Sequence, residues 1–145
     1  MDGRRLRLAV VLAVVVAVVM PTTPALARRA IHGCKIIRRP TPAHHTDCPN
    51  ANLRWADLSF ADVGHARLRH ARLSHANLWY ADLGFANLRH TDLRDTTLDH
   101  VILRSADLTG ADLRDADLTD VRWSNTTCPD GTNSDDHAHT CERHL

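Results

Sequence analysis

The chain has 145 residues, with 18 Lys plus Arg against 17 Asp plus Glu, and 4% of its residues are aromatic. This near-neutral balance excludes a simple polybasic nucleic-acid binder, and the content of 6 Gly and 6 Pro excludes collagen. The length suits one small domain.

Residues 1–27 have the pattern of a secretory signal peptide. The positive n-region consists of Arg4, Arg5 and Arg7. An uncharged apolar core follows at 8–20, and the Ala-Leu-Ala sequence at 25–27 matches a small-x-small cleavage site. Because this core of 13 residues is shorter than the ~20 of a membrane-spanning helix, we expect cleavage before Arg28 and no stable membrane anchor afterwards. We therefore predict a secreted or extracytoplasmic protein, with association to the cell envelope as an option.

Cleavage at this point leaves 15 basic and 16 acidic residues, which is a formal charge of −1 at pH 7 with His neutral. All 11 His residues remain after cleavage. Because free imidazole has a pKa of about 6.5, the chain should become cationic as the pH falls below that value.

Sixteen five-residue units fill 51–130, starting ANLRW, ADLSF, ADVGH, with Leu third in thirteen units and Ala first in eleven. In a helix of about 100° per residue, a five-residue step would wind the leucines around the cylinder. In a straight strand, an odd step would flip them from face to face. The chain must therefore turn once per unit, with positions one and three inside and the last two residues at a corner.

These units resemble the pentapeptide-repeat family, whose motif is A(D/N)Lxx, and the ending CPDGTNSD...C resembles the tail of its exported bacterial members. The resemblance implies an all-β fold, a right-handed quadrilateral β-helix with four units per coil, hence about four coils. Positions one and three fill its interior, and the other positions face solvent. The units TTLDH and VILRS lack the small Ala, and Ile102 replaces an outward polar residue. We expect a local packing adjustment there, with a bulge or a contact as alternatives.

The repeat frame constrains the four cysteines. Cys48 and Cys128 both occupy third positions 80 residues apart, so four coils separate them and they are too distant for a disulfide. Two pairings remain, and Cys34–Cys48 with Cys128–Cys141 is the more economical. Export favours oxidised cysteines, which would staple terminal loops over the open ends of the rod.

The chain is thus predicted to contain four segments. They are the signal peptide at 1–27, an N-terminal cap segment at 28–50 with Cys34 and Cys48, the repeat β-helix at 51–130, and a C-terminal cap tail at 131–145 with Cys141.

Histidines close to the terminal cysteines suggest a metal site as an alternative, since zinc and copper bind Cys and His. The candidates are His137, His139 and His144 near Cys141, and His44 and His45 near Cys48. Their spacing is not specific for a metal. We expect no metal and no cofactor.

Residues twenty apart should lie above one another on the outside of the rod. Rings at fifth positions gather in the first two coils, and the net charge changes from +2 over 51–90 to −5 over 91–130. The candidate binding face consists of Phe60, Trp79, Tyr80 and His100. Clustered exposed aromatics are typical of contact surfaces. The alternative is that these rings only shield neighbouring coils at the corner.

The sequence contains no catalytic constellation, and we predict no enzyme. Two acidic stacks, Asp92 over Asp112 and Asp95 over Asp115, are interleaved with Arg94 and Arg114. This alternation predicts a compensated charge ladder and not an acid/base pair.

The resemblance also implies one further role, that of a DNA mimic, because some cytosolic members of the family resemble DNA in shape and charge and bind gyrase. The near-neutral mature charge and the export signal argue against it, and we expect no nucleic-acid partner. We predict a secreted, non-enzymatic scaffold or interaction module whose partner is an unknown protein or envelope component. A His-rich metal-binding or pH-responsive envelope protein is the alternative, and end-to-end pairing of two copies stays open.

Overall fold

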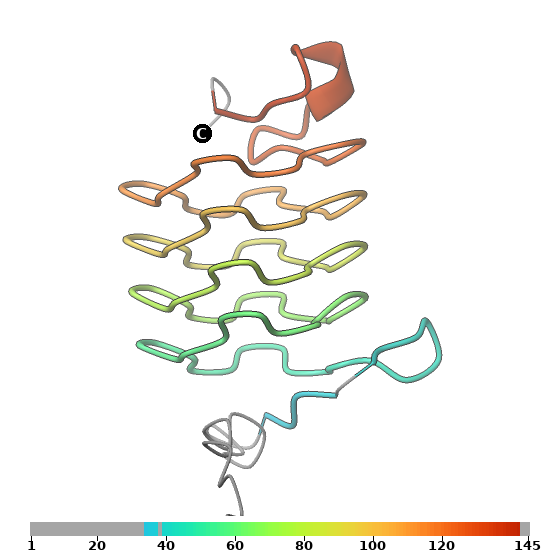
Figure 1. Cartoon of the computed structure of the whole chain (residues 1–145), viewed down its shortest axis with the longest axis vertical. Coiled ribbons are helices and arrows are strands. Elements are labelled where there is room, and N and C mark those ends of the chain that lie inside the picture. The colour runs from blue at the N-terminus through green and yellow to red at the C-terminus, as the bar shows by residue number, and fades with distance from the viewer. Residues whose placement is uncertain (1–33, 38, 143–145) are drawn as a thin grey trace, which may run out of the picture.

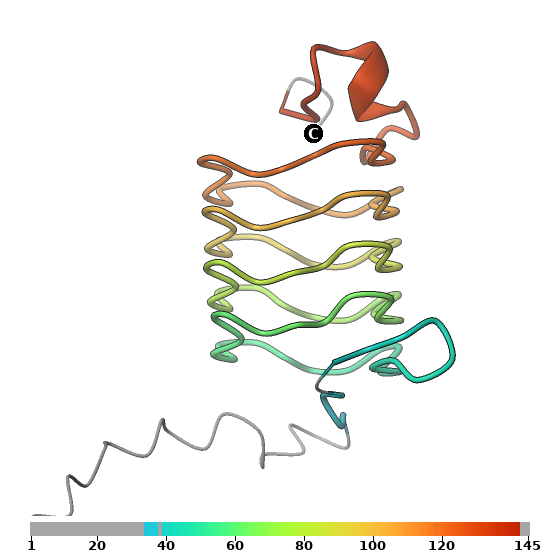
Figure 2. The same cartoon turned by 45° about the vertical axis from the view of Figure 1, so that its right-hand side comes forward.

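The computed structural model describes residues 34–37 and 39–142, so the predicted signal peptide and His144 lie outside the described residues. The chain climbs as a rod of stacked coils, with the repeats running from green at the base to orange near the top (Figures 1 and 2). In the described part of the chain, the one named element is the short 3-10 helix η1, Ser134–Asp136. None of its helices is long and apolar enough to span a membrane.

The coils are joined by parallel β-bridges between residues twenty apart, such as Asn52 with Arg72. Around this bridge, the Leu53 amide donates to the Arg72 carbonyl at 2.7 Å, and the Arg72 amide donates to the Ala51 carbonyl at 2.8 Å. The same pattern continues up the rod, so each side of a coil pairs with the side above it. One coil therefore takes twenty residues, or four units.

Each unit ends in a tight turn at positions four and five. The Ala56 amide donates to the Leu53 carbonyl at 3.1 Å, and Trp55, the third residue of this turn, has φ of 61°. A positive φ at that position is the mark of a type II turn. From Trp55 to Asn125, every fifth residue has φ between 52° and 69°. Val, Ile and Thr never occupy the fifth position of a repeat, because β-branched side chains tolerate this conformation least.

The Asp or Asn at position two supports the turn. The Asp82 Oδ1 accepts the Gly84 amide at 2.8 Å, and the Asn87 Oδ1 accepts the Arg89 amide at 3.2 Å. Short carboxylate and amide side chains commonly bond the backbone two residues ahead in this way. The motif A(D/N)L thus combines a small interior residue, a turn acceptor and a large interior residue.

Leucines at position three and small residues at position one fill the interior of the rod. Where Thr replaces Ala, its hydroxyl bonds the coil below: Thr96 donates to the Leu73 carbonyl at 3.0 Å, and Thr126 donates to the Leu103 carbonyl at 2.8 Å. The unit TTLDH therefore adjusts by a hydrogen bond. Val101 of VILRS is buried.

The expectation that all other positions face solvent is wrong at three fourth positions. Gly64, Ser74 and Gly84 are buried. A glycine or serine is so small that the neighbouring coil covers it.

The β-helix begins one unit earlier than the predicted boundary at Ala51. In 46–50, Thr46 and Cys48 are buried, Asp47 bridges Arg67, and Asn50 has φ of 60°. This unit has Thr in place of Ala and Cys in place of Leu, and its geometry agrees with the third position that the repeat frame assigned to Cys48.

Both ends of the rod carry a disulfide. Cys34 is bonded to Cys48 with a Cα–Cα distance of 5.2 Å, and Cys128 is bonded to Cys141 with a distance of 5.3 Å. These are the pairings preferred from the sequence.

The tail folds over the last coil, where η1 stands at the red end of the rod in Figure 1. The Ser134 amide donates to the Thr126 carbonyl at 2.9 Å, and the Ser134 hydroxyl donates to the Trp123 carbonyl at 3.1 Å. Asn133 caps η1 by accepting the Asp135 amide. The tail therefore occupies backbone groups of the last coil that would otherwise be an open edge.

Candidate interaction surface

Three rings lie above one another at one corner of the rod. The centroids of Phe60 and Tyr80 are 5.8 Å apart with planes 16° from parallel, and those of Tyr80 and His100 are 4.4 Å apart with planes 22° from parallel. Trp79 lies across this stack, 4.8 Å from Phe60 and 4.9 Å from Tyr80, at 71° and 87°. The structure thus brings all four predicted face residues together. We call Phe60, Trp79, Tyr80 and His100 the aromatic corner.

The aromatic corner is open to solvent. The exposed fractions are 65% for Phe60, 46% for Tyr80 and 39% for Trp79. The turns cause this exposure, since the fifth position of each unit and the larger fourth-position side chains such as Trp79 project outward from the corners. Contiguous exposed apolar surface of this kind is uncommon on soluble proteins and typical of interaction sites.

The face predicted from the sequence did not include two carboxylates that lie at the edge of the corner. The Trp79 Nε1 donates to the Asp99 Oδ2 at 3.1 Å, and the Asp99 Oδ1 pairs with the His100 Nδ1. The His100 Nε2 lies 3.6 Å from the Asp120 Oδ2. The twenty-residue period was a sufficient signal, because Asp99 follows Trp79 by twenty residues and Asp120 follows His100 by twenty.

Among the described residues, Asp99, His100 and Asp120 form the one group of three metal-ligand types whose ligand atoms lie within 4.8 Å of one another. Each imidazole nitrogen of His100 already faces a carboxylate. These contacts between the imidazole and the two carboxylates account for the cluster without a metal.

Within residues 34–37 and 39–142, the cysteines and histidines considered for the caps form no group of three ligands close enough to share a metal. Cys48 and Cys141 are in disulfides and offer no thiolate. The His139 Nδ1 lies 3.2 Å from the Asp135 Oδ1, and His144 lies outside the described residues.

Ring stacks also occupy the other corners of the first two coils. Trp55, which is 71% exposed, stacks on His75 at 4.1 Å, and His65 stacks on Phe85 at 4.9 Å. These pairs show that fifth-position rings cover one another between coils. The aromatic corner differs from them by the added indole of Trp79 and by a second carboxylate, since the Trp55–His75 stack has only Asp95, with its Oδ2 3.7 Å from the His75 Nε2.

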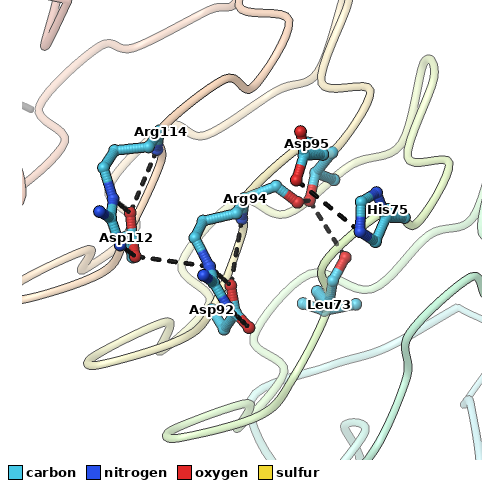
Figure 3. Close-up of polar contacts among 8 residues, drawn as sticks. Leu73, His75, Asp92, Arg94, Asp95, Asp112 and Arg114 are labelled. Atoms are coloured by element: carbon cyan, nitrogen blue, oxygen red, sulfur yellow. Dashed lines mark hydrogen bonds and ion pairs between the residues drawn. The ribbon is translucent and has the colours of Figure 1, made fainter.

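The predicted charge ladder is present, as Figure 3 shows. The Arg94 Nε lies 2.9 Å from the Asp92 Oδ1 and 3.6 Å from the Asp112 Oδ2, and the Arg114 Nη2 lies 2.6 Å from Asp112. The Asp95 carboxylate lies 3.7 Å from the His75 Nε2.

The arginines keep these carboxylates ionised. Hydrogen bonds from Arg114 lower the pKa of Asp112 to about 2, and hydrogen bonds from Arg94 lower the pKa of Asp92. A carboxyl group that stays ionised at neutral pH does not serve as a general acid there. The ladder therefore offers no general acid at neutral pH.

Comparisons with known proteins agree with this architecture. The family model described as pentapeptide repeats matches residues 51–84 and 81–120, with 8 copies. No curated protein sequence matches the chain significantly.

Three solved structures are similar to this chain. A pentapeptide repeat protein from the cyanobacterium Cyanothece 51142 is 32% identical with a TM-score of 0.55, over 55% of this chain and 54% of that one. HetL from Nostoc sp. strain PCC 7120, involved in heterocyst differentiation regulation, is 38% identical with a TM-score of 0.38, over 66% and 46%. A thylakoid-lumen pentapeptide repeat protein from Arabidopsis thaliana is 24% identical with a TM-score of 0.48, over 62% and 66%. The chain spans about half the length of the two cyanobacterial proteins.

Pentapeptide-repeat proteins form right-handed quadrilateral β-helices and are mostly non-enzymatic scaffolds or regulators. The five-residue units, the twenty-residue bridges and the family match all point to the same conclusion. Through its repeats, this chain belongs to the pentapeptide-repeat family and has the right-handed quadrilateral β-helix of that family.

Proposed function

We propose that this protein is an extracytoplasmic, non-enzymatic interaction module that binds a partner protein through the aromatic corner. One observation carries the proposal: Phe60, Trp79 and Tyr80 are in mutual contact and each exposes more than a third of its surface. Aromatic residues are enriched at the energetic centres of protein interfaces, where they bury large area at low entropic cost.

The geometry favours a protein over a sugar as the partner. A sugar stacks on a free ring face, whereas the faces of Tyr80 are covered by Phe60 and His100. The stack therefore presents mostly ring edges, which suit the side chains of a protein surface. Asp99 and Asp120 add an acidic rim, so the complementary partner surface carries apolar residues flanked by Lys or Arg.

The location outside the cytoplasm is supported by the signal pattern at 1–27 and by the two disulfides. In this proposal the rod consists of four predicted coils closed by disulfide-stapled terminal segments. Covered ends favour a rod that acts as a monomer and binds through its side.

The experiment first identifies the partner and then measures the affinity. A photo-crosslinking amino acid in place of Phe60 would capture proteins that touch the corner in the producing cells. Affinity for the purified partner is then compared between the wild-type protein and the double variant Trp79→Ser with Tyr80→Ser. We expect the double variant to bind at least about a hundredfold more weakly, because two central aromatic anchors are lost.

A matched control changes a ring stack on another corner, Trp55→Ser with His75→Ser. Both double variants should retain the thermal unfolding transition of the intact rod, since all four side chains lie outside the core. Equal weakening by both double variants, or none by the first, would contradict the proposal.

A pH-responsive role of the same corner is a second candidate, favoured by the placement of His100 between Asp99 and Asp120. Protonation of this imidazole would offset the acidic rim that faces the partner. Affinity would then weaken on acidification in the wild-type protein, and His100→Gln would flatten the pH profile. A profile that His100→Gln leaves unchanged would exclude this role.

A further inference from the structure

A groove of about 520 Å³ runs along one side of the rod, on the side built by the units that start at 61, 81, 101 and 121. Its floor includes Gly64 and Gly84. The side chains that the inference uses are Asp62, Asp82, Phe85, Ile102, Arg104 and Arg122, all of which line the groove. We call this feature the glycine groove.

The hollow exists because two successive fourth positions have no side chain. Gly64 and Gly84 lie in neighbouring coils, and both are buried as backbone floor. Pro40 of the N-terminal segment closes one end, with its Cγ 3.7 Å from the place that a Cβ on Gly64 would occupy. The volume falls within the ~300–1,000 Å³ range of small-ligand sites.

Acidic side chains line one end of the groove and basic side chains line the other. Counting coils of twenty residues from Ala51, Asp62 and Asp82 come from the first and second coils, and Arg104 and Arg122 come from the third and fourth. In the part of the chain that the structure describes, none of these four side chains forms an ion pair.

The charge ladder on another side shows the contrast, because its arginines and aspartates are paired with each other. Unpaired charges of opposite sign at the two ends of one groove complement a ligand with an ammonium group at one end and an anion at the other.

The middle of the groove is apolar. Ile102 stands at a second position, where most units have a polar residue, and it is half-buried. Phe85 is 46% exposed, and its ring is held between His65 at 4.9 Å and the Arg104 guanidinium at 5.1 Å. An apolar ligand side chain would therefore contact Ile102 and the edge of Phe85.

We propose that the glycine groove binds a short zwitterionic peptide of about three residues in extended conformation. Its ammonium group lies at Asp62 and Asp82, its carboxylate lies at Arg122 with Arg104 alongside, and a central apolar side chain packs on Ile102.

The lengths agree with this placement. Coils spaced like β-strands at ~4.8 Å place Asp82 and Arg122 about 10 Å apart along the rod. Three extended residues at about 3.3–3.6 Å each span the same distance. This proposal is independent of the aromatic corner, because none of the four residues of the aromatic corner lines the groove.

The test titrates the oxidised full-length chain with the peptide Ala-Leu-Ala, observed by ¹H–¹⁵N NMR. We expect saturable shifts at amides of the units that line the groove. N-acetylated Ala-Leu-Ala and C-amidated Ala-Leu-Ala should each bind at least about tenfold more weakly, since each loses one charge-assisted contact.

Charge-removing variants locate the site without disturbing the fold. Asp82→Asn keeps the turn acceptor, because in the neighbouring units Asn77 and Asn87 accept the equivalent amide, two residues ahead. Arg122→Gln removes the guanidinium. Each variant should weaken Ala-Leu-Ala binding at least about tenfold. The controls Asp57→Asn and Arg72→Gln change second-position residues outside the groove lining and should bind like the wild-type protein.

Several results would overturn the proposal. These are no saturable shift at about 10 mM peptide, equal binding of capped and free peptides, or equal weakening by the control variants. Inorganic phosphate is the comparison ligand: if phosphate binds as tightly as Ala-Leu-Ala and depends on Arg122 but not on Asp82, the groove is an anion site and not a peptide site.

Discussion

Gly110 lies directly against the imidazole of His90 in the coil below. A Cβ added to Gly110 would overlap the His90 Nδ1 and stand 2.7 Å from its Cε1. His90 is itself stacked on His70, with centroids 5.1 Å apart and planes 9° from parallel. Gly110 also has φ of +69°, so this position combines a left-handed backbone with a close contact.

We therefore expect Gly110→Ala to destabilise the rod by about 2–3 kcal/mol, the sum of a left-handed backbone cost and the loss of the His90–His70 stack, because the exposed His90 ring has to move away from the added methyl group. Denaturant unfolding measures the loss. Gly131→Ala is the matched control, because Gly131 has φ of +88° with nothing within 4 Å of an added Cβ. Gly131→Ala should lower the free energy of unfolding only by the cost of the left-handed backbone, about 1–2 kcal/mol. Equal losses in the two variants would show that contact with His90 has no energetic weight.

The charge ladder predicts an acid-sensitive contribution to stability. Hydrogen bonds from Arg114 lower the pKa of Asp112 from 3.8 to about 2 in the folded protein. Because the folded-state pKa is depressed, the carboxylate stabilises the fold above about pH 4, and this stabilisation is lost as the pH falls through about 2. Melting temperatures between pH 7 and pH 2 should thus fall less steeply in Asp112→Asn than in the wild-type protein.

Arg114→Gln provides the complementary check for the ladder, since it removes the donor and leaves the carboxylate. Its melting temperature should also depend less on pH in the acid range. If the melting temperature of both variants depended on pH as steeply as that of the wild-type protein, this partly exposed ion pair would contribute nothing measurable to stability.

The C-terminal disulfide should be a major source of stability. Cys128 and Cys141 are buried and close a loop with a sequence separation of 13. Replacing both by Ala should cost about 2–4 kcal/mol, because the unfolded chain regains the entropy of the open loop. Thermal unfolding with and without reductant measures this effect. Reductant should lower the melting temperature of the wild-type protein more than that of the variant, and an equal response would contradict the assignment.

The amino-acid sequence by itself determined the turn in every unit, the interior positions and the interleaved charges of the ladder. The reason is periodicity: a Leu that recurs every five residues is buried each time only if the chain turns once per unit, which leaves few architectures. The same frame separates Cys48 from Cys128 by four coils and places the four residues of the aromatic corner in neighbouring columns.

The tertiary structure alone decided the rest. The repeat frame placed Cys48 at a third position, but only the structure shows that the β-helix starts at Thr46, because burial accepts Thr and Cys where the repeat has Ala and Leu. The glycine groove depends on Gly64 and Gly84 lying in adjacent coils and on Pro40, whose position the repeat does not determine. The link from Trp79 through Asp99 to His100 depends on side-chain orientation, which periodicity leaves free because outward side chains are not constrained by the core.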